Sequence, residues 1–321
     1  MSDLNAMTLD LDAPPAERWA GIEAHADAVA ELVAVYKQDI GQVDEFRELL
    51  TYYRDAYIPL DQQVELDSIA ARTGVDPLDL TLVNVYYDAF KHAMACTAFG
   101  TNTPAGPLHA RNLDWHSPRD ALRRHSQVHV YTSGGEVVCK SLAWPGFIGV
   151  FTGVSPGAFA VSLNAVVSED PPGEGMPVAL LLREALVACL PFDGAVEHLR
   201  ASPLVCDCLL LVSGTQNDEL AVVERTPTRG VVRRAGSGHV AATNDYRLLG
   251  GHGAQAAVDA LRATSDRRYD TTCARVATEA PTDADACLRI LNDRHVRMDI
   301  TVQQAVMSAA EGTLVANAVL R

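Results

Sequence analysis

Apolar residues recur at helical spacing through the first part of the chain. Between residues 16 and 95 they return every three or four positions, which is the period of an amphipathic helix. Gly41 ends the first predicted helix, and Pro59 ends a second one that starts near Val43. Another helix is predicted to begin at Asp76-Pro77, a pair typical of helix starts. The apolar positions of the first helix are Ala20, Ile22, Ala26, Val29, Leu32, Val33 and Tyr36.

The pattern changes after Cys96 to short apolar runs separated by turn residues. Hairpin turns are predicted at residues 102–106, 133–135 and 155–157. Because parallel strands need long crossover connections, consecutive hairpins favour antiparallel sheets, with helices covering their outer faces. The expected strands are Thr97–Thr101, Leu108–Trp115, Gln127–Thr132, Glu136–Ala143, Phe147–Gly153, Ala158–Val166, Leu209–Ser213, Leu220–Glu224, Val231–Arg234, Ile300–Met307 and Thr313–Val319. The expected helices are Met176–Leu190, Asp193–Ala201, Gln255–Ala263, Ser265–Thr278 and Thr282–Leu291.

Charge divides the chain at the same place. The 321 residues carry a formal net charge of −15. Residues 1–95 hold 18 acidic and 6 basic side chains, whereas residues 96–321 hold 23 and 20. A chain this acidic lacks the cations that sequence-independent binding to nucleic acid requires. The asymmetry predicts a boundary near residue 95.

The cysteines and the first residues suggest a location. Seven cysteines, an odd number, are expected to be reduced thiols in a cytosol-like compartment. The first 15 residues have neither a basic region nor an apolar one, so no secretory signal is expected, and no run is long enough for a transmembrane helix. The sequence-based expectation is a cytoplasmic protein without stable membrane insertion.

Cys96, Arg111 and Asp114 are the first candidates for chemistry. In a hairpin that turns near residue 105, Cys96 pairs with Leu113, next to Arg111 and Asp114. A guanidinium beside a thiol stabilises the thiolate, the nucleophilic form of cysteine. Judged from these residues alone, a buried structural cysteine beside an ion pair is the more common arrangement.

The same residues carry a family resemblance. Cys-Thr-Ala-Phe-Gly at 96–100, a short hairpin and then Arg-Asn-Leu-Asp-Trp at 111–115 resemble the start of the catalytic subunit of N-terminal-nucleophile cysteine amidases. This family includes acid ceramidase, N-acylethanolamine acid amidase, choloylglycine hydrolases and isopenicillin N acyltransferases. In it, the cysteine becomes N-terminal when the precursor cleaves itself. The resemblance implies an α+β fold, a four-layer αββα sandwich of two antiparallel sheets flanked by helices.

Further segments follow in the order that the family has them, over roughly residues 80–320. One ends in Asn164, another contains Asn244, and a third contains Arg268 as the favoured arginine. The segments that resemble the family are Ala158–Asn164, Val212–Thr215, Val222–Arg225, Ala242–Tyr246, Asp266–Tyr269 and Val296–Asn317. The ordered series is specific to the superfamily and leaves the substrate open.

The resemblance implies a reaction and a division of the chain. Cys96 would attack a non-peptide linear amide and form an acyl-thioester, with its freed α-amino group as the base. Asn164 and Asn244 would stabilise the oxyanion, Asp114 would hold the α-amino group, and Arg111 would position Cys96. Residues 1–95 would be a pro-segment or a retained small subunit, and residues 96–321 the catalytic domain. The expected substrate is a small N-acyl compound with an apolar acyl group, and no cofactor is implied.

Two alternatives stay open at this point. The acyl group could pass to an amine, as in the penicillin-forming acyltransferases. The chain could also be an unprocessed, non-catalytic relative in which residues 1–95 cover Cys96. Ala98 and Phe99 keep this second alternative open, because relatives often carry Ser and Ile there.

Other motifs give no metal or cofactor site. Cys206-Asp207-Cys208 places both thiols on one face of a strand, where buried core thiols are expected. His125 and His129 have helical spacing but lie in a segment predicted as a strand, too far apart to share an ion. Residues 250–253, Gly-Gly-His-Gly, are expected to form a mobile loop before a helix.

Overall fold

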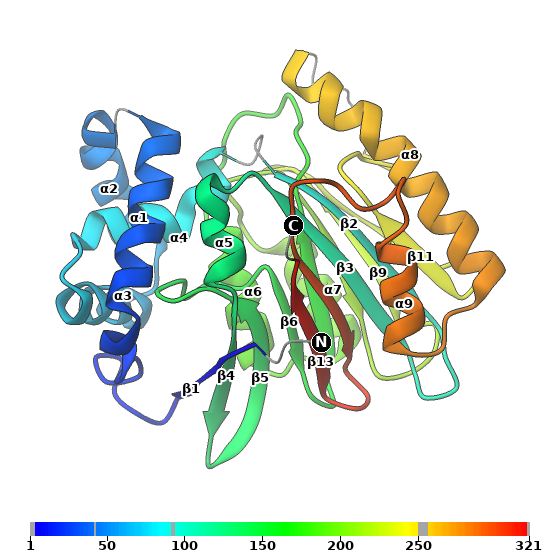
Figure 1. Ribbon diagram of the computed structural model, residues 1–321, viewed down its shortest axis with the longest axis horizontal. Helices are drawn as coiled ribbons and strands as arrows, with labels where there is room; N and C mark the ends of the chain where they lie inside the picture. Colours follow the sequence, from blue (N-terminus) through cyan, green and yellow to red (C-terminus); the bar gives the residue numbers. More distant parts are fainter. Residues whose placement is uncertain (1–3, 42, 91–93, 250–255, 320–321) are drawn as a thin grey trace.

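Two β-sheets lie face to face at the centre of the protein (Figure 1). The structure is a computed structural model that describes residues 4–41, 43–90, 94–249 and 256–319. Neighbouring strands run antiparallel, except β1 and β4, which are parallel. The larger sheet has the order β1 (Ala6–Asp10), β4 (Gln127–Ser133), β5 (Glu136–Ala143), β6 (Thr152–Ser155), β7 (Phe159–Asn164), β8 (Cys208–Ser213), β9 (Leu220–Arg225) and β10 (Gly230–Arg234). The smaller sheet has the order β11 (His239–Ala242), β2 (Met94–Thr101), β3 (Leu108–Trp115), β12 (Thr301–Ser308) and β13 (Thr313–Ala318).

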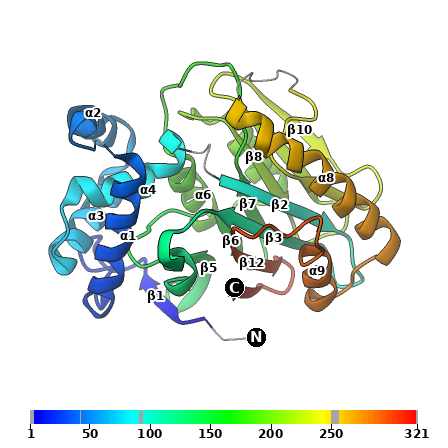
Figure 2. The same cartoon turned by 45° about the horizontal axis from the view of Figure 1, so that its top comes forward.

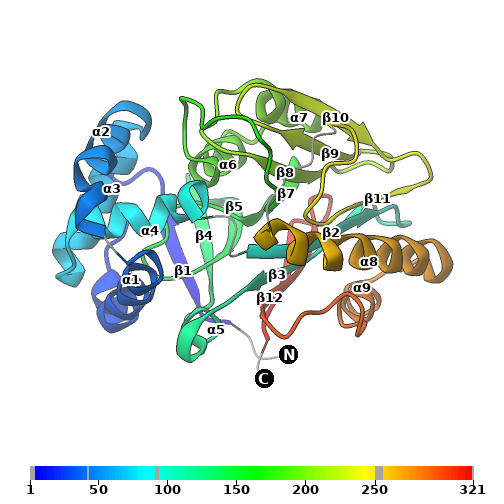
Figure 3. The ribbon, with the colours of Figure 1, turned by 90° about the horizontal axis from the view of Figure 1, so that it is seen from above.

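Helices cover the outer face of each sheet and complete four layers. α6 (Val178–Val187) and α7 (Phe192–Ala201) pack on the larger sheet. α8 (Ala256–Glu279) and α9 (Ala284–Leu291) pack on the smaller one. Figure 3 shows this succession from α7 through both sheets to α8 and α9. The αββα sandwich implied by the sequence resemblance is therefore confirmed.

The central strands are buried along their whole length. Every residue of β2, β3, β7, β8, β9 and β12 is buried. Each sheet meets the other sheet on one face and helices on the opposite face, so these strands do not alternate between buried and exposed residues. Polar side chains in them lie in the interior and need partners there.

The N-terminal segment forms a helical cluster beside the sandwich, coloured blue to cyan in Figure 1. Asp76 caps its last helix as predicted, accepting the backbone N–H of Leu78 and Asp79 at 2.9 and 3.0 Å. The cluster consists of α1 (Ala26–Ile40), α2 (Arg47–Tyr57), α3 (Leu60–Thr73) and α4 (Pro77–Phe90). Short turns of helix are η1 (Ile22–His25), η2 (Val43–Phe46), η4 (Pro118–Asp120) and α5 (Ala121–Arg124). In the described part of the chain, no helix combines the length and apolar character needed to span a membrane.

A buried ion pair joins this segment to the sandwich. Arg183 of α6 donates two hydrogen bonds of 2.7 Å to Glu65 of α3. Trp19 and Arg18 donate to the same carboxylate at 2.8 and 2.9 Å. Burial alone would raise the pKa of Glu65, but Arg183 and the hydrogen bonds from Trp19 and Arg18 hold it below its ordinary value.

Aromatic rings form a second contact between the segment and the sandwich. Tyr36 of α1 and Tyr86 of α4 each place their ring centroid 5.4 Å from that of Trp115, at the end of β3. Trp115 in turn contacts Trp144 and Phe151 at 6.0 and 6.2 Å. Such ring pairs add attraction to the burial of apolar area.

The structure corrects several sequence-based elements. The segment 1–95 is not only helical, because Ala6–Asp10 forms β1 along β4. Residues 147–151 lie in an irregular connection, so the predicted strand Phe147–Gly153 begins only at Thr152. The short strand β11 and helix α3 were not predicted as separate elements.

The two helices predicted on either side of residue 264 are one helix, α8. The residues at the predicted boundary, Thr264 and Ser265, are of types that favour helix ends over helix interiors, yet the helix continues through them. In the structure Ser265 lies inside α8 and accepts a hydrogen bond from the backbone of Asn244. The predicted loop at 250–253 lies outside the described residues.

We expect the Arg183–Glu65 pair to contribute strongly to stability. Arg183→Met should lower the free energy of unfolding by about 3–5 kcal/mol, because it leaves a buried carboxylate short of partners. Chemical denaturation measures this loss. Asp193→Ala is the control, because its pair with Arg234 is exposed, and it should change stability by less than about 0.5 kcal/mol. Equal losses in the two variants would contradict the prediction.

Candidate active site

Cys96 belongs to β2, a strand of the smaller sheet that has β3 and β11 as neighbours. Figure 2 shows β2 beside β3, with α8 running over them. The β2–β3 hairpin pairs Cys96 with Leu113 and Ala95 with Asp114, which confirms the predicted register. The Cys96 side chain is fully buried, and its Sγ lies 3.6 Å from the carbonyl oxygen of Leu163 on β7. The bond between Ala95 and Cys96 therefore lies inside a continuous strand.

Arg111 brings positive charge to the sulfur from the neighbouring strand. Its Nη2 lies 3.2 Å from Cys96 Sγ and donates to the carbonyl oxygen of Leu163 at 2.6 Å. Its Nη1 donates to the carbonyl oxygen of Phe151 at 2.8 Å and to the Thr152 hydroxyl. These carbonyls fix the guanidinium without neutralising its charge, so it can stabilise negative charge that develops on the sulfur.

Asn244 and Arg268 hold the backbone of Cys96 from the opposite side. The Cys96 N–H donates to Asn244 Oδ1 at 3.1 Å. Arg268 of α8 donates to the same Oδ1 at 2.7 Å, to the Thr97 hydroxyl at 3.0 Å and to the Cys96 carbonyl oxygen. The arginine favoured from the sequence thus contacts the candidate nucleophile directly.

Asn164 ends β7 on the larger sheet and ties the two sheets together. Its Nδ2 donates to the carbonyl oxygens of Ala242 and Thr243 at 3.0 and 3.1 Å. Its Oδ1 is buried and has no hydrogen-bond partner among the described residues. In the intact chain, both amide hydrogens of Asn164 are therefore used by the backbone, next to Leu163 and the sulfur.

Asp114 is a buried carboxyl group beside the bond that precedes Cys96. The Thr301 hydroxyl donates to its Oδ1, and its Oδ2 has no hydrogen-bond partner within the described ranges. Burial raises the pKa of Asp114 to about 6, although Arg268, Thr301 and Arg111 act in the opposite direction. A carboxyl with this pKa can change its charge near neutral pH.

Several residues of the site are not predicted from the sequence. Ser265 accepts the backbone N–H of Asn244 at 2.8 Å, and Thr97 accepts from Arg268. Tyr87 of α4 donates to the carbonyl oxygen of Asp207 at 3.0 Å and lies 3.5 Å from that of Asn164. Thr97 stands beside Cys96 in the motif, but no sequence signal placed Tyr87 there, since it belongs to a regular apolar helix.

The histidines and cysteines considered as metal ligands lie in different places and contact different partners. His125 follows α5, not a strand as predicted, and its Nε2 lies 2.8 Å from Glu31. His129 is buried on β4, and its Nε2 contacts Gln127 at 2.8 Å. Cys206 Sγ lies 3.0 Å from Asp88 Oδ1. In the part of the chain that is described, no three His, Cys, Asp or Glu side chains are grouped as metal ligands would be.

Comparison with protein families identifies the chain. Residues 101–320 match the family described as acyl-coenzyme A:6-aminopenicillanic acid acyl-transferase. The chain belongs to this family. The matched region begins five residues after Cys96 and includes Arg111, Asp114, Asn164, Asn244 and Arg268.

The chain is also similar in sequence to several enzymes of known name. N-acylethanolamine-hydrolyzing acid amidase of Caenorhabditis elegans is 27% identical over 68% of this chain and 66% of its own length. The enzyme of the same name from Cavia porcellus is 27% identical over 95% of this chain and 87% of its own length. Acid ceramidase of Bos taurus is 23% identical over 68% of this chain and 62% of its own length. The chain thus spans slightly less than two thirds of the length of the Caenorhabditis elegans and Bos taurus relatives.

A solved structure supports the fold of the family member. The Caenorhabditis elegans N-acylethanolamine-hydrolyzing acid amidase ortholog superposes with a TM-score of 0.56 and 21% identity. The superposition covers 67% of this chain and 93% of the other chain. At this identity the likeness establishes the shared fold.

We expect Asp114 to lower stability as the pH rises. A carboxyl whose pKa is raised from its ordinary 3.8 to about 6 binds its proton more tightly in the folded state. Its contribution is complete below pH ~3.8 and is lost as the pH rises through about 6. The loss amounts to roughly 3 kcal/mol. Denaturation of the wild type and Asp114→Asn at pH 4 to 7 measures it, and a pH-independent difference between them would contradict the prediction.

Proposed function

We propose that this protein is an autoprocessed cysteine N-terminal-nucleophile hydrolase that cleaves a non-peptide linear amide. One observation carries the proposal: the sulfur and the backbone nitrogen of Cys96 are held by separate sets of buried groups. Arg111 contacts the sulfur, and Asn244 accepts the N–H. A structural cysteine in a core needs an acceptor for its N–H, but it needs no guanidinium beside its sulfur.

Self-cleavage would begin from the intact geometry. The Cys96 sulfur, having lost its proton, attacks the carbonyl carbon of Ala95, and the peptide C–N bond breaks as the nitrogen takes up a proton. Water then hydrolyses the resulting thioester, which leaves a carboxylate on Ala95 and a free thiol and amine on Cys96. The amine stays where Asn244 already accepts its N–H, and Asp114 faces Ala95 across the hairpin.

Substrate turnover would repeat the same steps on an external amide. The thiolate attacks the carbonyl carbon, the amine leaves with the proton of the Cys96 ammonium group, and water hydrolyses the acyl-thioester. Asn244 is better placed than Asn164 to stabilise the oxyanion. Its Nδ2 has one acceptor among the described residues, Ala165 at 2.7 Å, whereas both amide hydrogens of Asn164 are used.

The surroundings of the site favour an apolar acyl group. The carbonyl oxygen of Phe151 accepts a hydrogen bond from Arg111. The centroid of the Phe151 ring lies 5.9 Å from that of Tyr87 and 6.2 Å from that of Trp115, so aromatic rings lie close to the site. Two relatives are named N-acylethanolamine-hydrolyzing acid amidase and acid ceramidase, and these names support an N-acyl amide as the substrate class. We therefore propose a small N-acyl amide as substrate. We also propose a reducing, cytosol-like compartment, because none of the seven cysteines forms a disulfide bond within the described residues.

Acyl transfer to an amine is the second candidate, because the matching family is described as an acyl-transferase. Both reactions share the acyl-thioester on Cys96 and differ only in the group that attacks it. Product analysis with an added primary amine distinguishes them, since only transfer consumes the amine.

We also propose that residues 1–95 stay bound as a small subunit. β1 remains hydrogen-bonded to β4, and Glu65 remains paired with Arg183 across the cut. Tyr87 supports the carbonyl oxygens of Asn164 and Asp207 from the small-subunit side. The site would therefore lose one of its walls if the segment left.

We expect the wild-type chain to separate into pieces of 95 and 226 residues on denaturing gels, the larger beginning Cys-Thr-Ala-Phe. Cys96→Ala should stay whole and inactive, because it lacks the attacking sulfur. Intact mass and N-terminal sequencing check both expectations. Cys189→Ala removes an exposed thiol and should cleave like the wild type. Normal cleavage of Cys96→Ala would rule out the mechanism.

The two pieces should co-elute in size-exclusion chromatography under native conditions and separate only in denaturant. Their buried ion pair and shared sheet give the physical reason. Arg183→Met should release the small piece at lower denaturant concentration, whereas the exposed-pair control Asp193→Ala should not. A cleaved, active protein that lacks residues 1–95 would show that retention is unnecessary.

A further inference from the structure

Glu224 is a carboxylate in a place where the strand pattern requires an apolar side chain. It is the fifth residue of β9, and Val222, on the same face two positions earlier, packs between the sheets with Leu209 and Val240. Glu224 is itself fully buried. Because burying a charge is costly unless it is paired and hydrogen-bonded, its partners indicate what it contributes.

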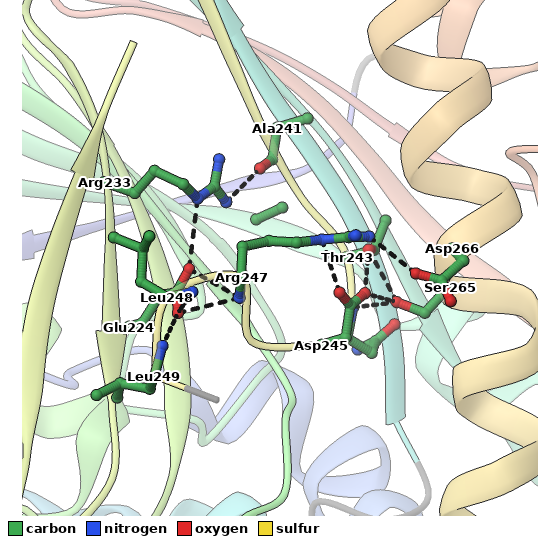
Figure 4. Close-up of polar contacts among 12 residues, drawn as sticks. Glu224, Arg233, Ala241, Thr243, Asp245, Arg247, Leu248, Leu249, Ser265 and Asp266 are labelled. Carbon is green, nitrogen blue, oxygen red and sulfur yellow. Dashed lines mark hydrogen bonds and ion pairs between the residues drawn. The ribbon is translucent and has the colours of Figure 1, made fainter. Parts of the chain in front are cut away.

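The partners of Glu224 are three consecutive backbone amides and one guanidinium (Figure 4). The N–H groups of Arg247, Leu248 and Leu249 donate to its carboxylate at 3.1, 2.8 and 3.0 Å. Arg233 of β10 donates through Nε at 3.3 Å and reaches the carbonyl oxygen of Ala241 through Nη2 at 2.8 Å. Through these hydrogen bonds, Glu224 links β9 of the larger sheet to residues 247–249, which follow β11 of the smaller sheet.

The fastened segment leads back to Asn244. The Arg247 side chain lies 2.7 Å from Asp245 and 3.1 Å from Asp266 on α8, and it covers the Tyr269 ring at 3.9 Å. Asp245 accepts from the hydroxyl of Ser265, and Ser265 accepts the backbone N–H of Asn244 at 2.8 Å. These contacts run without a gap from Glu224 to the residue that binds Cys96.

The register of β11 explains why Asn244 needs such support. β11 pairs with β2 up to Ala242 opposite Ala98, and two positions further along this register Asn244 comes opposite Cys96. There the ladder ends, and the Asn244 side chain takes the place of a backbone carbonyl. The chain must turn away at this point for the side chain to face Cys96, and backbone pairing no longer fixes it.

We propose that Glu224 is a positioning residue for Asn244. Its carboxylate holds the turn at Arg247–Leu249 and thereby sets the distance between the Asn244 amide and Cys96. This role rests on the function proposed above, because Asn244 is a catalytic residue only if Cys96 is the nucleophile. Glu224 does not touch the reacting atoms and acts through the backbone that carries Asn244.

A double-mutant cycle tests the proposal in the full-length protein. The variants are Glu224→Leu, Asn244→Ala and their combination, with the rates of self-cleavage and of turnover of an N-acyl amide as readouts. Glu224→Leu should lower kcat by about 10- to 100-fold with little change in KM, because it misplaces a catalytic group. The double variant should be no slower than Asn244→Ala alone. Losses that multiply would overturn the proposal.

Glu224→Gln keeps the size of the side chain and one carbonyl acceptor for the loop amides. It should therefore recover part of the rate, and it carries the test if Glu224→Leu does not fold. Wild-type rates in Glu224→Gln, with stability lowered as in Glu224→Leu, would mean that the residue is only structural.

Glu219 offers a matched control at the other end of the β8–β9 hairpin. It too is a carboxylate that accepts backbone amides of a turn, those of Thr215 and Gln216 at 2.7 and 2.8 Å. Glu219→Gln should leave both rates unchanged. The behaviour of the wild type distinguishes a failure of the proposed function from a failure of the role of Glu224. An uncleaved wild type with an unreactive Cys96 refutes the proposed function. A cleaving wild type with an equally fast Glu224→Leu refutes only the role of Glu224.

Discussion

The backbone N–H of Cys96 donates its hydrogen bond to the side chain of Asn244 and not to the backbone of a neighbouring strand. The arrangement of the site depends on that one hydrogen bond. A buried amide needs an acceptor, and β11 stops two residues before it could supply one. Asn244 supplies it instead. The same oxygen accepts from Arg268, which also reaches the Cys96 carbonyl, so one asparagine and one arginine fix both sides of a single residue.

Charges in the interior follow from this arrangement. Arg111 and Arg268 lie near Cys96, and Asp114 is the buried carboxyl group between them and the β12 strand. Backbone carbonyls and neutral side chains accept hydrogen bonds from both guanidinium groups, which leaves positive potential around the sulfur. Replacing such groups by apolar ones of similar size is often neutral or stabilising in other proteins. Several charged groups gathered around one buried thiol are typical of a reactive centre.

Local patterns in the sequence predict much of this protein, and contacts between distant segments account for the rest. The turn near residue 105 fixes the pairing of Cys96 with Leu113, because a short hairpin allows one register. Asp76 marks the start of α4 for an equally local reason. The parallel pairing of β1 with β4 joins residues more than a hundred positions apart and leaves no local signal. The sequence predicts a helix that starts at Ser265, whereas Ser265 lies inside α8 and its side chain contacts Asn244. The strand that ends at Glu224 is predicted, but the contacts of Glu224 with residues 247–249 leave no local signal.

The position of the Ala95–Cys96 bond inside β2 has one more consequence. In the intact chain, Met94 and Ala95 are buried and pair with Trp115 and Asp114. If the proposed cleavage takes place, the new carboxylate of Ala95 is left beside Cys96, where the acyl group of a substrate would have to bind. The end of the proposed small subunit would then compete with the substrate from within the same protein. Turnover would require that Met94 and Ala95 first separate from β3.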